Sequence, residues 1–85
     1  MHDFHIANHV SKLILENAEK SNLKKVTKAV IRLGTVVEHD EQVKPENLIF
    51  NVRILLKNSI AEDLEVQVIP VEGDSWELEK IEGEE

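Results

Sequence analysis

The residues of this chain whose types and spacing could do chemistry stand at its first three positions, Met1, His2 and Asp3. The α-amine of Met1, the backbone nitrogen of His2 and the His2 imidazole can close a five-membered and a six-membered chelate ring on one metal ion. The backbone nitrogen of Asp3 can add a fourth donor in the same plane. A planar set of nitrogen donors suits Ni(II) or Cu(II) and suits tetrahedral zinc poorly. The alternative interpretation is that Met1 and His2 are only the start of the chain.

The remaining histidines are weaker candidates for metal ligands. His5 and His9 are four residues apart, so on a helix both would project from one side and could share an ion. We interpret them first as polar residues that flank an apolar stripe, and we keep an axial or second metal site as an alternative hypothesis. His39 lies in the acidic run at residues 38–41, where we expect a solvated loop rather than a strong site for a divalent ion.

Length and composition limit the other classes of function. We expect the 85 residues to form one domain, and the net charge of −7 disfavours binding to nucleic acid or to an anionic membrane. The chain has no cysteine, which excludes disulfides, thiolate zinc sites and a cysteine nucleophile. No phosphate-binding glycine loop, nucleophile–base pair or pair of catalytic carboxylates stands out, so we expect no enzyme. No run resembles a membrane span or a signal peptide, which predicts a cytoplasmic protein.

Two segments have the apolar spacing of amphipathic helices. Residues 3–20 carry one apolar stripe, and Asp3 can cap their start. The second helix opens at residues 44–46, because Pro45 suits a first helical turn, and it should end near residues 58–59. Phe50 and Ile54 widen its apolar stripe and predict contacts on two sides. The rest of that stripe is Leu48, Ile49, Val52, Leu55 and Leu56.

Three segments, residues 25–33, 63–71 and 75–81, have the composition or the alternation of strands. Along the first, we expect one face against the helices and the other partly exposed. The inner face would be Thr27, Ala29, Ile31 and Leu33, and the outer face Val26, Lys28, Val30 and Arg32. Pro70 predicts that the second strand lies at a sheet edge or ends there. Residues 35–43 predict a surface loop, residues 72–74 a turn, and residues 82–85 a frayed tail.

These elements predict an α+β fold in the order helix, strand, helix, strand, strand (α-β-α-β-β). Two helices packed on one face of a small three-stranded sheet would bury all the apolar stripes together. Residues 1–85 would then form a single domain.

The order and the residues of this chain resemble the hydrogenase nickel-incorporation proteins, the HypA/HybF family. The likeness begins at Met1-His2-Asp3, where that family has Met-His-Glu, and continues in residues 25–28 and 31–34, KVTK and IRLG. It resumes in Pro45-Glu46-Asn47-Leu48 with Phe50, and returns in residues 64–66 and 73–82. Each piece is weak alone, but their order and spacing together are fairly specific.

The resemblance implies a nickel-binding domain that helps to deliver Ni(II) to [NiFe]-hydrogenase, and in some organisms to urease. It implies a metal site at Met1, His2 and Asp3, and as partners a GTPase of the HypB type and a hydrogenase large subunit. The chain departs from the family between its last two strands, where the family carries a zinc domain with two C-x-x-C pairs. Here a short turn near residues 72–75 takes that place. It also has four more residues between Gly34 and Val43 than the family pattern.

The sequence therefore supports two hypotheses of different classes. The first is a nickel-binding metallochaperone for hydrogenase maturation, with Ni(II) held by the Met1 amine, the His2 imidazole and the backbone amides of His2 and Asp3. The alternative is a metal-free interaction or regulatory module that retains the fold. The sequence leaves both a monomer and a homodimer open, because the edge near Pro70 could pair with a second chain.

Overall fold

The central element of the structure is one long strand that pairs on both sides. The structure is a computed structural model, and it describes residues 4–38 and 40–85. The elements in chain order are α1 (Phe4–Lys20), β1 (Lys25–Leu33), β2 (Val37–Glu38), β3 (Glu41–Gln42), α2 (Pro45–Leu55), β4 (Glu65–Pro70) and β5 (Trp76–Glu84). The predicted α+β fold of two helices and a three-stranded sheet is confirmed.

The three-stranded sheet has the order β4-β1-β5, with β1 in the middle. Strand β4 runs parallel to β1, and β5 runs antiparallel to it. Parallel neighbours need a crossover connection, and α2 lies in the one between β1 and β4. Pro70 is the last residue of β4 and β4 is an edge strand, so the prediction made from this proline is confirmed on both counts.

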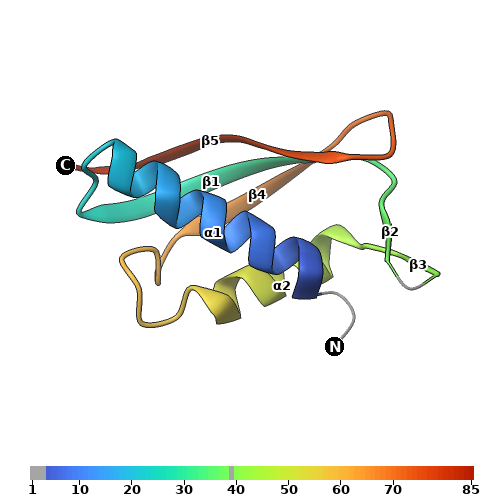
Figure 1. Cartoon of the computed structure of the whole chain (residues 1–85), viewed down its shortest axis with the longest axis horizontal. Coiled ribbons are helices and arrows are strands. Elements are labelled where there is room, and N and C mark those ends of the chain that lie inside the picture. The colour runs from blue at the N-terminus through green and yellow to red at the C-terminus, as the bar shows by residue number, and fades with distance from the viewer. Residues whose placement is uncertain (1–3, 39) are drawn as a thin grey trace.

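Strands β4 and β5 are consecutive in the chain but do not pair with each other. Because β1 lies between them, residues 71–75 must pass across its end to reach the far edge of the sheet. Figure 1 shows this connection at the end of the sheet opposite the C-terminus. The turn at residues 72–74 is therefore correctly predicted as a turn, but it does not close a hairpin.

Both helices contribute to one layer beside the sheet (Figure 1). Helix α1 packs against α2 and also contacts β5 and β1, while α2 contacts β4. The interior between these layers is aliphatic, with buried residues from both helices, β1 and β4, while β5 packs the partly buried Trp76, Leu78 and Ile81 against it. Its largest fully buried side chains are Ile14, Ile31, Leu48, Leu56, Leu64, Val10, Val26, Val43 and Val52.

The two faces of β1 differ from the predicted assignment at one end. Val26 is buried and Thr27 is exposed, the reverse of the expectation from strict alternation. The pairing register between β1 and β5 shifts between Val26 and Lys28, which is the signature of a β-bulge. A bulge places an extra residue in one strand and so exchanges the faces beyond it. From Ala29 onward the predicted inner residues are buried, but Val30 on the outer face is buried too.

Two segments predicted to be irregular are strands. Residues 35–43 contain the antiparallel pair β2 and β3 rather than only a loop. The predicted frayed tail at residues 82–85 is wrong, because β5 continues to Glu84, where Glu84 pairs with Lys25. The Lys24 amide also donates to the Glu84 carbonyl at 2.6 Å. The tail is ordered by partners in β1, which its own acidic sequence does not reveal.

Part of the predicted buried stripe of α2 faces outward. Leu48, Val52 and Leu56 are fully buried, but Phe50 is 63% exposed and Ile54 is 47% exposed. Leu55 is also exposed. The prediction of contacts on two sides of this helix is therefore wrong, because α1 and β4 cover only one side of it.

We predict that Leu48→Ala lowers the free energy of unfolding by about 2–5 kcal/mol, since it leaves a cavity among fully buried side chains. Phe50→Ala removes a larger side chain from the same helix but should change stability by no more than about 0.5 kcal/mol, because Phe50 is largely in solvent. Urea denaturation followed by circular dichroism measures both. Equal losses in the two variants would contradict the described orientation of α2.

Candidate metal site

The predicted metal donors precede the first helix directly. Met1, His2 and Asp3 lie outside the described residues, so their arrangement stays a prediction. Helix α1 begins at Phe4, the next residue, and runs without interruption to Lys20. Its buried residues hold it against the rest of the fold, among them Ile6, Ala7 and Val10. The donors are thus tethered to an element that is anchored from its first turn.

His9 lies next to an aromatic residue from the far end of the chain. Its ring centroid is 6.4 Å from that of Trp76, and the two rings are tilted by 49°. Trp76 is the first residue of β5 and pairs with Leu33 of β1. His9 and Trp76 line a surface groove between α1 and β5 together with Lys12, Leu13 and Glu16. The sequence analysis did not predict that these two rings are neighbours, because 66 residues lie between them in the chain.

His5 lies one helical turn before His9, and both side chains are exposed. The predicted placement of this pair beside an apolar stripe is confirmed, because Ile6 and Val10 next to them are buried. Among residues 4–38 and 40–85, no group of three or more histidine, aspartate or glutamate side chains is arranged to hold a metal ion. His39 is outside the described residues, so its weak acidic site is untested.

Residues 71–75, which connect β4 to β5 across the end of β1, form backbone hydrogen bonds with the last residue of β1 and the two residues after it. The Gly34 amide donates to the Ser75 carbonyl and the Thr35 amide to the Gly73 carbonyl, each at 2.8 Å. The Val71 amide donates to the Leu33 carbonyl at 3.0 Å. A Cβ atom on Gly34 would lie 2.6 Å from the Gly73 carbonyl oxygen, closer than such atoms can approach. Glycine at this position therefore lets the chain pass from β4 to β5 directly over β1.

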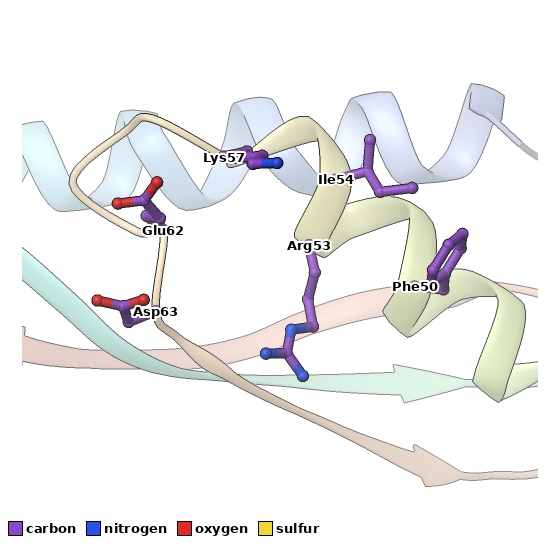
Figure 2. Close-up of a pocket in the computed structure, with 6 residues that line it drawn as sticks. All are labelled: Phe50, Arg53, Ile54, Lys57, Glu62 and Asp63. Carbon is purple, nitrogen blue, oxygen red and sulfur yellow. The ribbon is translucent and has the colours of Figure 1, made fainter.

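A second groove lies along the outer side of α2 and the loop that follows it. It is lined by Phe50, Arg53, Ile54, Lys57, Glu62 and Asp63. Figure 2 shows the first three of these on α2 and the two acidic residues on the loop that leads to β4. The side chain of Glu62 accepts a hydrogen bond from the Asn58 amide at 3.1 Å, which ties this loop to the end of the helix.

None of the helices in the described part of the chain is long and apolar enough to cross a membrane.

Two helices on one side of a β4-β1-β5 sheet define the class of domain, and a solved structure shares it. The solution structure of the Ni metallochaperone HypA from Helicobacter pylori matches with a TM-score of 0.68 at 15% sequence identity. The match covers 84% of this chain and 58% of that one. This likeness shows a common fold.

Sequence comparison identifies the family. The chain is 31% identical over 74 residues to the hydrogenase maturation factor HypA of Methanobrevibacter smithii. That alignment covers 85% of this chain and 56% of the relative, so the chain spans a little more than half of the relative's length. No protein-family profile matches the chain. The chain belongs to the hydrogenase nickel-incorporation (HypA/HybF) family, and both relatives are named for maturation or metal delivery rather than for a catalysed reaction.

We predict that Gly34→Ala destabilises the fold by about 1–3 kcal/mol, the usual cost of forcing an extra methyl group into a packed site. The clash is with backbone atoms of Gly73 and Ser75, which cannot rotate away. Ser75→Ala is the matched control, because Ser75 contributes its carbonyl rather than its exposed side chain. Thermal unfolding of the two variants would show the difference. A Gly34→Ala protein as stable as Ser75→Ala would mean that the connection does not cross here.

Proposed function

We propose that this protein is a nickel-binding accessory protein for the maturation of [NiFe]-hydrogenase. The observation that carries the proposal is the 31% identity to a hydrogenase maturation factor over most of this chain. The amino-terminal sequence Met1-His2-Asp3 supports it independently, since its donors suit square-planar Ni(II). In the proposed site, Ni(II) is bound by the Met1 amine, the amides of His2 and Asp3, and the His2 imidazole.

The chemistry of these donors makes nickel binding depend on pH in one direction. The amine, the two amides and the imidazole must all be free of the competing proton before they bind the metal. Protons therefore compete with Ni(II), so the affinity rises as the pH rises and falls as the medium becomes acidic. Such a site releases its cargo when a partner supplies protons or displaces the terminal donors.

We propose the partners of this protein from its family. We infer a GTPase of the HypB type and a hydrogenase large subunit as the proteins that act with this one, in the cytoplasm. We also infer that this chain does without the zinc domain, because β4 and β5 are joined here by only five residues, which hydrogen-bond to the last residue of β1 and to the two residues after it. Whether the chain forms a homodimer stays a prediction.

A second function has its own observation in its favour. Phe50 and Ile54 are exposed on one side of α2, in the groove that also contains Arg53. Exposed apolar residues gathered on one helix are typical of surfaces that bind another protein. A metal-free interaction module would use this surface and would bind its partner equally well with and without Ni(II).

We predict that the untagged protein binds one Ni(II) as a yellow, diamagnetic complex whose affinity rises with pH. Absorbance titration and calorimetry at several pH values measure this. His2→Ala should abolish the tight binding, and acetylation of the Met1 α-amine should do the same, because each removes one donor of the chelate. Adding one residue before Met1 is not a suitable control. It would move the His2 side chain to the third position of the chain, where the terminal amine, two backbone amides and the imidazole still close a planar four-nitrogen chelate.

Binding of equal strength in the parent, the His2→Ala variant and the acetylated protein would contradict the proposed site. Absence of Ni(II) binding in the parent, together with nickel-independent capture of a partner GTPase, would favour the interaction module. Phe50→Ala, which should leave nickel binding unchanged, separates the two surfaces in the same experiment.

A further inference from the structure

We propose that His5 and His9 form a second site for a divalent transition metal on α1, distinct from the amino-terminal donors. Helix α1 is regular from Phe4 to Lys20, so residues four apart lie one turn apart on the same side. At this spacing the Cβ atoms are about 5–6 Å apart, within reach of one ion held between two imidazoles. Both histidines are exposed, so an ion can reach them from solvent.

The packing of α1 fixes the direction in which the pair points. Ile6, Ala7 and Val10 are buried against the rest of the fold, which prevents the helix from rotating about its axis. His5 and His9 therefore stay at the border of the buried face. The Trp76 ring beside His9 further limits the conformations of that imidazole. A ligand held in place before binding loses less conformational freedom when the ion arrives.

The donor set indicates the kind of ion and the strength of binding. Neutral imidazoles suit Ni(II), Cu(II) and Zn(II), with Cu(II) bound most tightly of the three. No group of three or more histidine or acidic side chains is arranged to hold an ion in the described part of the chain, so water completes the coordination of a two-histidine site. Ni(II) with two imidazoles and water is six-coordinate and paramagnetic, unlike the diamagnetic complex expected at Met1, His2 and Asp3. The site is therefore weaker and exchanges faster.

The charges in the groove beside His9 do not oppose a cation. Lys12 and Glu16 line the groove next to His9, and their charges offset each other. The chain as a whole carries a net charge of −7, which raises the local concentration of cations. In nickel delivery, a role that rests on the proposed function, this pair would receive Ni(II) two residues from the terminal donors. Metal binding by the pair does not rest on that function.

The test uses the full chain with its amino-terminal donors disabled by His2→Ala and acetylation of Met1. Trp76 is the only tryptophan, and it lies beside His9, so Ni(II) bound there should quench its fluorescence. We expect saturable quenching with one ion bound, observed by fluorescence and calorimetry. Adding His5→Gln or His9→Gln should weaken binding by at least about tenfold, the lower end of what losing even an outer-sphere partner costs.

Two matched controls separate the pair from other histidines. The double variant His5→Gln, Asn8→His keeps the number of imidazoles but puts them on adjacent residues, which point in different directions on a helix. Asn8 is exposed, so the helix should remain intact, as circular dichroism would verify. This variant should lose the quenching as His5→Gln does. His39→Gln should leave it unchanged.

Quenching that survives in His5→Gln and His9→Gln, or that disappears in His39→Gln, would overturn the proposal. So would the absence of binding at millimolar Ni(II). This outcome is independent of the outcome for the amino-terminal site. If the unmodified chain fails to form the yellow complex but the chain with disabled amino-terminal donors shows quenching, the His5 and His9 site is supported and the proposed function is contradicted. A yellow complex in the unmodified chain without quenching in the disabled chain would contradict the His5 and His9 site alone.

Discussion

The structure depends on the position of β1, which is hydrogen-bonded on both sides and covered by the helices on one face. Because β4 and β5 pair only with β1, neither edge strand has another partner in the sheet. The core residues Val26, Ala29 and Ile31 come from this strand, and they meet buried residues from both helices. Loss of β1 would leave the other strands unpaired and the helices without their shared surface.

The same arrangement explains why position 34 requires a glycine. The chain must pass from one edge of the sheet to the other over the end of β1, and Gly34 lies where it crosses. The hydrogen bonds from Gly34 and Thr35 hold the crossing segment close. Because β4 and β5 are each paired with β1 rather than with each other, the sheet does not depend on the length of their connection. A change in the length of this connection would leave the pairing of both edge strands with β1 unchanged.

The proposed metal site makes few demands on this fold. Its donors are a terminal amine, two backbone amides and one imidazole, so no side chain from the core is needed to complete it. The fold contributes an anchored helix that begins at the residue after the donors. The pair His5 and His9 is different, because it exists only when α1 is helical and its position beside Trp76 exists only when β5 is paired with β1. Unfolding would therefore separate the ligands of that pair while leaving the terminal chelate chemically intact.

The sequence by itself determined the features that depend on neighbouring residues. The apolar spacing of residues 3–20 gave α1, Pro45 gave the start of α2, and Pro70 gave the end of an edge strand. The chelating donors of Met1, His2 and Asp3 are also local, because they belong to consecutive residues. The need to bury the apolar stripes together predicted two helices on a three-stranded sheet, and the fold confirmed it.

Only the tertiary structure decided the features that depend on which segments meet. The bulge that buries Val26 arises from pairing with β5, and the order of β5 up to Glu84 arises from pairing with Lys25. Phe50 is as apolar as its buried neighbours, yet no element covers its side of α2. Local periodicity records which faces of an element are apolar, but burial requires a partner on that face, and the partners here are far away in the chain.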